Sequence, residues 1–300
     1  MIYDIIILGS GPAGLTAAIY GSRANKNVLV LGGSDLGGQA SGIPKVENYP
    51  GFIGSGLDLC EFMKKQAESF GTKFVFAAAK SVKNNGVFVI SADDGNEYEA
   101  KSVIIATGAS PKKLEIKGAR ELTGHGVSYC ATCDGFFFSG KPVAVYGGGN
   151  SALNDALYLA NIASKVYIIY RKESFTRAEA ILVKRVQETS NIECVFNTEI
   201  ASIEGAESGL SSITTNHGNK IDVEGLFVAI GHEANTDFLS EDYKRDQFGK
   251  LATDVNSAKI SDGLFVAGDV RSSNKMQICV ATGWGCEAAM DAIAYLNKRA

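Results

Sequence analysis

The chain has 300 residues, of which 45% are hydrophobic and 21% are charged, and this balance is ordinary for a soluble globular protein. At about 150 residues per domain, the length predicts two domains, each able to bury its own core. Lys and Arg number 29 and Asp and Glu number 33, so the net charge of −4 leaves no basic excess for binding nucleic acid. No run approaches the ~20 apolar residues that span a bilayer, and the start, Met1-Ile2-Tyr3-Asp4, is unlike a secretion signal. We therefore expect a cytoplasmic protein that binds neither membranes nor nucleic acid.

Two segments of the chain repeat one pattern, in which a short apolar run is followed by a glycine turn and then by helical periodicity. The first copy comprises Tyr3–Leu8, the turn Gly9-Ser10-Gly11-Pro12-Ala13-Gly14 and a helix over Leu15–Ala24; the second comprises Pro142–Tyr146, the turn Gly147-Gly148-Gly149-Asn150-Ser151-Ala152 and a helix over Leu153–Ala163. Each copy leads to another apolar run, Val28–Leu31 or Val166–Ile169. Short β-branched runs of this kind are typical of buried parallel strands, so each copy is a βαβ unit.

Three further strands end at glycines, near Gly108, Gly231 and Gly268, and a helix is predicted over Gly283–Leu296. The last strand follows the end of the second βαβ unit, so the simplest arrangement is nested. We predict an α/β fold with two Rossmann-like, three-layer dinucleotide-binding domains. Residues 1–113 and 238–300 form the first domain, and residues 114–237 form the second domain, inserted into it.

A glycine turn between a strand and a helix is suited to the pyrophosphate of a dinucleotide. The first glycine allows the tight turn, the second lets the backbone approach the phosphates, and the third lets the helix pack on the strand. A single such motif could be a coincidental turn, but here both copies have the required strand before them and helix after them. Two dinucleotide sites on one chain suggest a flavin and a nicotinamide cofactor.

The residues about 20 positions after each turn bear on the choice of nucleotide. After the second turn the chain reads Tyr170-Arg171-Lys172, followed by Arg177, with no acid at the end of the strand. Cations here would attract the 2′-phosphate of NADPH, although a solvated basic cluster is the alternative. After the first turn the corresponding acid is absent or displaced to Asp35.

Cys130-Ala131-Thr132-Cys133 is a pair of cysteines at a spacing that allows a disulfide bond. A zinc site would need two more ligands, and the other cysteines and histidines show no matching spacing, so we interpret the pair as redox-active. Asp134 follows the second cysteine and is either an acid–base group for the thiols or a turn residue. The remaining cysteines are interpreted as packing residues. Electrons would then pass from the nicotinamide to the flavin, to the disulfide and to an external disulfide.

Over nearly its whole length the chain resembles the low-molecular-weight thioredoxin reductases, with the motifs in the same order and at the same spacing. The stretches that carry the resemblance are Gly9–Gly14, Gly37-Gly38-Gln39, Glu47-Asn48-Tyr49-Pro50-Gly51, Ala106-Thr107-Gly108, Cys130–Gly135, Gly147–Ala152, Ala229-Ile230-Gly231-His232 and Gly268-Asp269-Val270. The resemblance implies an NADPH-dependent flavoprotein that reduces thioredoxin and forms a homodimer.

The resemblance also implies roles for individual residues. Cys133 would face the flavin, Cys130 would attack the thioredoxin disulfide, and Asp134 would be its acid–base partner. The implied FAD site consists of Gly9, Ser10, Gly11, Pro12, Ala13, Gly14, Gly38, Gln39, Asn48, Ala106, Thr107, Gly108, Gly268, Asp269, Gln277 and Ile278. The implied NADPH site consists of Gly149, Asn150, Ser151, Ala152, Arg171, Lys172 and Arg177. No residue is expected to bind a metal.

Three positions depart from the family pattern. The usual His-Arg-Arg-x-x-x-Arg stretch reads Tyr170-Arg171-Lys172 with one extra residue before Arg177, Met276 stands where an arginine is common, and no acid stands at Gly32. A lysine is a point charge rather than a bidentate fork, which weakens the preference for NADPH over NADH. Two alternatives remain: a dithiol oxidase that has lost its nicotinamide site, and a non-catalytic flavin-containing redox sensor.

Overall fold

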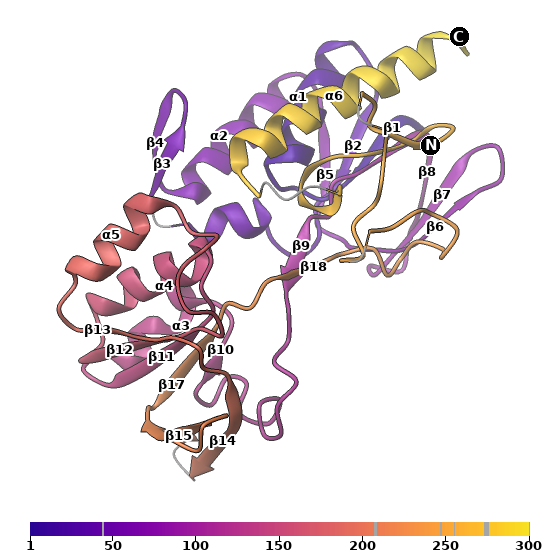
Figure 1. The fold of residues 1–300 in the computed structure, drawn as a ribbon. Helices are drawn as coiled ribbons and strands as arrows, with labels where there is room; N and C mark the ends of the chain where they lie inside the picture. Colours follow the sequence, from indigo (N-terminus) through magenta and orange to yellow (C-terminus); the bar gives the residue numbers. More distant parts are fainter. Residues whose placement is uncertain (44, 207–208, 247, 255, 273–275, 300) are drawn as a thin grey trace. The chain divides into compact units, whose positions relative to one another are not determined.

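The computed structural model describes residues 1–300 except 44, 207–208, 247, 255, 273–275 and 300 (Figure 1). The chain divides into two compact units: unit 1 comprises Met1–Ser110 and Glu233–Ala300, and unit 2 comprises Pro111–His232. The two connecting segments, β9 (Ala109–Pro111) and β18 (His232–Ala234), pair with each other as a two-stranded sheet. Unit 2 is therefore one continuous segment inserted into unit 1, and its limits lie a few residues before the boundaries expected from the sequence.

Unit 1 is built on an eight-stranded sheet whose central strands run parallel. Its path is β19 (Lys259–Ser261), β20 (Leu264–Val266), β8 (Glu97–Ile105), β1 (Ile2–Leu8), β2 (Val28–Leu31) and β5 (Lys73–Val75). β7 (Phe88–Ala92) pairs antiparallel with β8, and β6 (Ala79–Asn84) pairs antiparallel with β7. A separate hairpin is formed by β3 (Val46–Tyr49) and β4 (Phe52–Gly54). Apolar strands at the centre and antiparallel strands at the edge give the sheet a buried middle.

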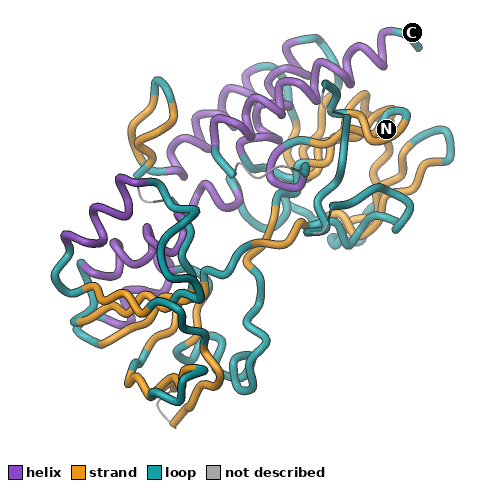
Figure 2. The backbone as a smooth tube through the Cα atoms, viewed as in Figure 1, coloured by secondary structure: helices purple, strands orange, loops and turns teal. Residues whose placement is uncertain are grey.

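The helices of unit 1 lie together on one side of its strands (Figure 2). They are α1 (Pro12–Arg23), α2 (Gly56–Ser69) and α6 (Ile278–Asn297), with short 3₁₀ turns at η1 (Gly38–Gly42) and η3 (Gly268–Val270). Ile5 and Ile7 of β1 pack in the same core as these helices, whereas Ile6 and Leu8 pack in a second core on the opposite face. Because both faces are covered, the strand is apolar at every position from Ile5 to Leu8 rather than at alternate ones.

Unit 2 is built on a five-stranded parallel sheet. Its order is β10 (Val127–Ser128), β17 (Gly225–Val228), β11 (Pro142–Tyr146), β12 (Lys165–Ile169) and β13 (Ile192–Val195). The helical segments are α3 (Ala131–Asp134), η2 (Gly135–Phe138), α4 (Asn150–Ala160) and α5 (Ala180–Glu188), and a small antiparallel sheet is formed by β14 (Ile200–Ala206), β15 (Gly209–Thr215) and β16 (Lys220–Asp222). One core lies with the helices and another with the small sheet, so unit 2 repeats the layered plan.

The predicted α/β fold with two Rossmann-like units is confirmed, and β2 and β11 have the bounds expected from the sequence. The helices begin earlier than expected: α1 begins at Pro12, α4 at Asn150 and α6 at Ile278. The reason for the first two is that the last residues of each glycine turn already form the first turn of the helix. Among the described residues, no helix is long and apolar enough to cross a membrane.

Candidate functional site

The first glycine turn joins β1 to α1 and is closed by contacts that only glycine permits. Gly9 has φ +111°, and a Cβ there would lie 2.3 Å from the carbonyl oxygen of Ala106. A Cβ on Gly14 would lie 2.0 Å from the carbonyl oxygen of Gly9. In contrast, a Cβ on Gly11 would have the Gly37 oxygen, at 3.8 Å, as its nearest neighbour. The first and third glycines therefore serve the fold, and the second leaves open space beside the turn.

The loop after β2 lies against this turn. The amide of Gly37 donates to the carbonyl oxygen of Ser10 at 3.0 Å. The buried Ser10 hydroxyl has two acceptors for its single proton, the carbonyl oxygens of Gly32 at 2.9 Å and Asp35 at 3.0 Å. Asp35 is thus held at the turn by its backbone, while its carboxylate accepts a hydrogen bond from the neighbouring serine. Gly38 and Gln39 follow in η1.

The other predicted flavin-binding strand ends come to the same region of unit 1. Gln39 Nε2 donates to the carbonyl oxygen of Ala109 at 2.8 Å, and Thr107 Oγ1 donates to the carbonyl oxygen of Asn235 at 2.7 Å. A Cβ on Gly268 would lie 2.9 Å from the Cβ of Ala13. The ends of β1, β8 and β20 therefore meet at one edge of the sheet, as the carboxyl ends of neighbouring parallel strands must.

Two predicted residues from distant parts of the chain are brought together by hairpin β3–β4 and helix α6. Asn48 Nδ2, on β3, donates to Oε1 of Gln277 at 3.2 Å. Gln277 is the N-cap residue of α6, which begins at Ile278. The hairpin residues Glu47–Ile53 also line a pocket, so Asn48 lies on its wall.

Asp269 is a half-buried residue in η3, three residues after the end of β20. Burial raises its pKa, and the positive charge of Lys250 opposes this effect in part. A carboxyl group with a raised pKa at the end of a central strand is suited to hydrogen bonding with a polar ligand rather than to pairing with a surface cation.

The second glycine turn, in unit 2, has the same design. A Cβ on Gly147 would lie 2.2 Å from the carbonyl oxygen of Ala229, and a Cβ on Gly148 would lie 2.5 Å from the ring of Tyr170. A Cβ on Gly149, in contrast, would have no described atom within 4 Å. Ala152 stands at the third glycine position and is fully buried. The aromatic ring of Tyr170 thus forms one wall of the turn, and Gly149 faces open space.

The N-termini of α1 and α4 have donors available for phosphate. Their N-cap residues are Gly11 and Gly149, and in the described part of the chain no side chain caps either helix. Helix α2 differs, because Ser55 accepts a hydrogen bond from the Asp58 amide there. Open glycines beside uncapped helix N-termini fit the pyrophosphate groups of two dinucleotides.

The basic residues predicted to select the nucleotide follow β12. Arg171 and Arg177 are exposed, and Lys172 is half-buried. Lys172 Nζ donates to Thr176 Oγ1 at 3.3 Å, so this lysine is tied back to its own loop. Thr176 directly precedes Arg177, where this sequence has one residue more than the family pattern.

Sequence reasoning missed an acid that reaches the second turn. Asn150, the first residue of α4, donates through Nδ2 to Glu179 Oε1 at 2.9 Å, and the Glu179 amide donates to Asn150 Oδ1 at 2.8 Å. These reciprocal bonds clasp the basic loop to the glycine turn. No local signal marks this pair, because 29 residues separate the partners.

The two cysteines of the predicted redox pair are joined by a disulfide bond, with their Cα atoms 5.3 Å apart. Cys130 is the N-cap residue of α3, and its Sγ accepts a hydrogen bond from the Cys133 amide at 3.2 Å. Cys133 is exposed and Cys130 is half-buried. Asp134 ends the same short helix, and one of its oxygens, Oδ2, accepts a hydrogen bond from Ser128 Oγ at 2.6 Å.

Two exposed aromatic side chains follow the redox pair and were not singled out from the sequence. Phe136 and Phe137 are 77% and 72% exposed, whereas Phe138 is packed edge-on against Phe227 with ring centroids 5.4 Å apart. The run of three phenylalanines after an Asp-Gly pair could have identified them. Large apolar side chains held in solvent are a common mark of a protein-binding surface.

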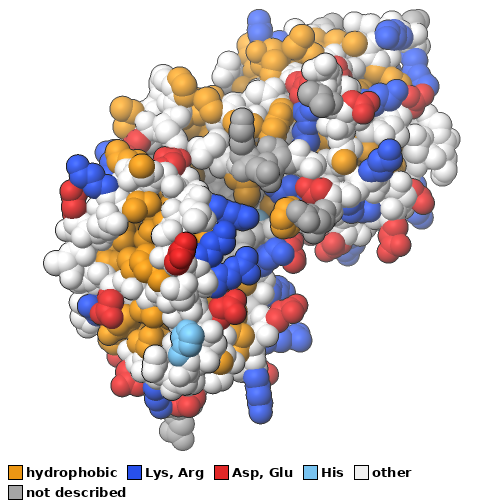
Figure 3. All heavy atoms as spheres, in the orientation of Figure 1, with side chains coloured by type: hydrophobic (Ala, Val, Ile, Leu, Met, Phe, Trp, Pro, Cys, Tyr) orange, Lys and Arg blue, Asp and Glu red, His pale blue; other side chains and the backbone are white. Residues whose placement is uncertain are grey.

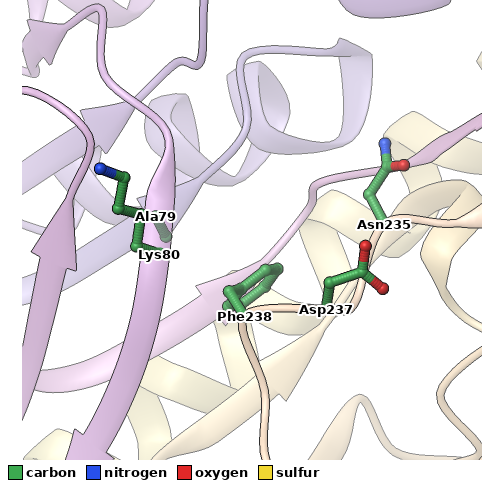
Figure 4. Close-up of a pocket in the computed structure, with 5 residues that line it drawn as sticks. All are labelled: Ala79, Lys80, Asn235, Asp237 and Phe238. Carbon is green, nitrogen blue, oxygen red and sulfur yellow. The ribbon is translucent and has the colours of Figure 1, made fainter.

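Two other groups of residues lie apart from this chemistry. Burial raises the pKa of the Cys60 thiol to about 11 and also raises that of Cys194, in line with their interpretation as packing residues. A pocket in unit 1 lies between β6 and the segment after β18, and Figure 4 shows the ring of Phe238 at its centre and the side chain of Lys80 directed away from Asp237. None of the predicted site residues lines this pocket.

Comparison with known proteins is consistent with these features. Residues 3–285 match the pyridine nucleotide-disulphide oxidoreductase family. The thioredoxin reductase of Helicobacter pylori is 41% identical, covering 98% of this chain and 99% of its own, and that of Rickettsia bellii is 42% identical, covering 98% of each. The solved thioredoxin reductase of Lactococcus lactis has a TM-score of 0.94 at 34% identity and covers 99% of both chains. The chain therefore belongs to the pyridine nucleotide-disulphide oxidoreductase family, and it is an oxidoreductase that works with flavin and nicotinamide cofactors.

Proposed function

We propose that this protein is a thioredoxin reductase that uses NADPH and FAD. The observation that carries the proposal is the Cys130–Cys133 disulfide beside Asp134, in a family member with two open glycine turns. The near full-length similarity to thioredoxin reductases of other organisms supports the same substrate. The dithiol oxidase and the redox sensor have no observation in their favour.

Each unit has residues for one cofactor. In unit 1, the open side of Gly11, the uncapped N-terminus of α1 and the Asn48–Gln277 pair are proposed to hold FAD. In unit 2, Gly149, Asn150, Ser151 and Ala152 are proposed to hold the pyrophosphate of NADPH. When bound, the flavin would carry two electrons from the nicotinamide to the disulfide.

The dithiol chemistry follows from thiol–disulfide exchange. Once the disulfide is reduced, the Cys130 thiolate attacks one sulfur of the thioredoxin disulfide; that S–S bond breaks, and a mixed disulfide forms. Asp134 is proposed to protonate the departing thioredoxin thiolate. The Cys133 thiolate then attacks Cys130, which re-forms the internal disulfide and releases thioredoxin with both sulfurs reduced. Two electrons have left this chain, and the second thioredoxin thiolate takes its proton from solvent.

Phe136 and Phe137 are proposed to form the surface on which thioredoxin docks. They are exposed, and they directly follow the helix that carries Cys133 and Asp134. Exposed aromatic side chains commonly anchor protein interfaces. A charged residue at either position would weaken the docking without touching the sulfurs.

The nucleotide preference is proposed to rest on Arg171, Lys172 and Arg177. Two guanidinium groups can pair with the 2′-phosphate of NADPH, and each charge-assisted bond contributes about 1.5–3 kcal/mol. Because the Lys172 ammonium group already donates a hydrogen bond to Thr176, we expect the preference for NADPH to depend mainly on the two arginines. Replacing both arginines with alanine would raise the KM for NADPH by more than about tenfold and leave that for NADH unchanged.

The protein is proposed to act as a homodimer through the helical face of unit 1. Exposed apolar side chains occur on α1, α2 and α6 and on hairpin β3–β4, and Figure 3 shows hydrophobic side chains gathered over this layer. The exposed residues include Tyr20, Ile53, Leu57, Phe62 and Met290. Association through this face would be tested by sedimentation of the Phe62→Glu variant, which we expect to be a monomer.

We also propose that the enzyme works in the cytoplasm. A protein whose redox disulfide is reduced from NADPH is suited to a reducing compartment. The four other cysteines are free thiols, which fits the same environment. Fractionation of cells that produce the tagged protein would test this assignment.

The proposed activity is tested by stopped-flow spectroscopy of the purified holoenzyme. NADPH should bleach the flavin absorbance faster than NADH does, and oxidised thioredoxin should then restore the absorbance rapidly. Cys130→Ser and Cys133→Ser should each reduce thioredoxin turnover by at least about 100-fold, because a nucleophile or its resolving partner is lost. Cys286→Ser, in unit 1, is the matched control and should keep full turnover.

The opposite results would reject the proposal. A preparation that binds no flavin would rule out the whole relay. Flavin that stays oxidised in excess NADPH would point to the dithiol oxidase. Reduced flavin that reoxidises no faster with thioredoxin than with oxygen alone would remove thioredoxin as the substrate.

A further inference from the structure

Ser128 is a buried serine that contacts both the acid and the cysteine of the redox site. Ser128 lies on β10, where it pairs with Phe227 of the neighbouring parallel strand β17. Ser128 is only 5% exposed. Its Oγ is 2.6 Å from Asp134 Oδ2, 3.0 Å from the Cys130 amide nitrogen and 3.3 Å from the Cys130 carbonyl oxygen. One hydroxyl group thus links Asp134 to the backbone of Cys130 at two points.

The hydroxyl has one proton to donate and two lone pairs, and the three neighbours use these in a defined way. The Cys130 amide can only donate, so it always occupies one lone pair. The proton then has two possible acceptors, the Asp134 carboxylate or the Cys130 carbonyl oxygen. The much shorter distance to Asp134 indicates that the proton points to the carboxylate when Asp134 is ionised.

Protonation of Asp134 leaves this arrangement fully bonded. A protonated Asp134 can donate to the second lone pair of Ser128 Oγ, and the hydroxyl proton then turns to the Cys130 carbonyl oxygen. No heavy atom has to move, and no polar atom loses its partner. The Asp134 amide also donates to that carbonyl oxygen at 3.2 Å, and a carbonyl oxygen accepts two such bonds.

We propose that Ser128 is a positioning residue that holds Asp134 beside Cys130 in both protonation states, so that the acid can release and regain a proton during thiol–disulfide exchange. The proposal rests on the proposed function and adds a residue to its mechanism. A group that formed a hydrogen bond only with the ionised carboxylate would oppose the protonation of Asp134. An apolar group in place of Ser128 would not fix the orientation of the Asp134 carboxyl group. A hydroxyl with an alternative acceptor avoids both problems.

The test compares Ser128→Ala and Ser128→Thr with the wild-type holoenzyme over a range of pH. The first readout is the rate at which reduced enzyme reacts with oxidised thioredoxin in a single turnover. The second is the rate at which iodoacetamide alkylates the reduced Cys130, which needs no thioredoxin. We expect Ser128→Ala to lower the exchange rate by about tenfold and to shift the pH profiles of both reactions, whereas Ser128→Thr, which keeps the hydroxyl, restores both profiles.

A double-mutant cycle separates positioning from a general loss of structure. In an Asp134→Asn background there is no proton to transfer, so adding Ser128→Ala should cause no further loss in exchange rate. Ser139→Ala, an exposed serine after η2, is the matched control and should behave as wild type. Thermal unfolding of each variant confirms that it is folded, and Ser128→Gly, which also removes the hydroxyl, carries the test if the alanine variant is not.

Three results would overturn the proposal. These are an unchanged pH profile in Ser128→Ala, an additive loss in the Asp134→Asn background, and a threonine variant that is folded but does not restore the profiles. A different failure would concern the proposed function alone. If wild-type enzyme does not reduce thioredoxin but Ser128→Ala still shifts the alkylation profile, the substrate is wrong and the role of Ser128 stands.

Discussion

Asn48 donates to Gln277 across 229 positions of the sequence, with 3.2 Å between Nδ2 and Oε1. The bond joins hairpin β3–β4 to the N-cap residue that precedes α6, within unit 1. Both residues are proposed to hold the flavin, and each keeps the other's amide in place. The pair therefore adds a polar link between two segments that also pack, through Tyr49, Phe52 and Ile278, on the same hydrophobic core.

The first prediction concerns this pair. Gln277→Ala should weaken FAD binding by about 2- to 10-fold, because one hydrogen bond contributes about 1 kcal/mol and its loss leaves Asn48 without this partner. Fluorescence titration of the apoprotein measures the affinity. The Asn48→Ala/Gln277→Ala double variant should be less impaired than the two single effects combined. Asn84→Ala, in the β6–β7 hairpin, is the control, and additive effects of Asn48 and Gln277 would contradict the linkage.

The second prediction compares two adjacent glycines of the unit 2 turn. Gly149→Ala adds a methyl group with no atom of the described residues within 4 Å, so the unfolding temperature should be unchanged. NADPH affinity should fall, because the methyl group occupies the space proposed for the phosphates. Gly148→Ala places its methyl 2.5 Å from the Tyr170 ring and should lower the unfolding temperature itself. Scanning fluorimetry and NADPH titration separate the two. Equal loss of stability in both variants would argue against an open phosphate face.

The third prediction concerns Glu179. Glu179→Gln keeps an oxygen to accept the Asn150 amide but removes a negative charge beside the proposed phosphate site, so NADPH should bind about two- to fivefold more tightly. Glu179→Ala removes the acceptor and should weaken binding instead. Isothermal titration calorimetry gives both affinities. Effects of the same sign in the two variants would show that the clasp does not position the turn.

The fourth prediction concerns the pH dependence of stability. Burial raises the pKa of Asp155, on α4, from 3.8 to about 7. Between these values the folded chain holds a proton that the unfolded chain has released, so this residue lowers stability progressively as the pH rises through that window. Asp155→Asn should therefore raise the unfolding temperature at about pH 8 and have little effect near pH 4. The gain in the free energy of unfolding at the higher pH should be at most about 4 kcal/mol. Exposed Asp222→Asn is the control; a gain that does not depend on pH would refute the assignment.

Much of this fold could be predicted because its signals are local. The buried strands β1, β2, β11 and β12 are apolar on both faces, so their runs are continuous in the sequence. The antiparallel strands β6, β7 and β14 to β16 were not predicted, because polar and partly exposed residues interrupt their apolar positions, and their pairing depends on tertiary packing rather than on a strong local pattern.

The site shows the same division. The spacing of Cys130 and Cys133 predicted a redox pair, and the structure joins them in a disulfide. The resemblance named Asn48 and Gln277 separately, but their hydrogen bond emerges only in the fold. No local sequence pattern pointed to Glu179, because its partner Asn150 lies 29 positions earlier in the chain, in the second glycine turn.

The sequence by itself determined the two βαβ units, their glycine turns and the redox pair. Each of these features depends on residues that are close together in the chain. The tertiary structure decided which remote groups share a site: the Asn150 amide with the Glu179 carboxylate, and the β3–β4 hairpin with the N-cap of α6. Such contacts depend on the register of the strands and on the packing of the helices against the sheet. Both are determined by the burial of apolar surface over a whole unit, so no short segment of the sequence encodes them.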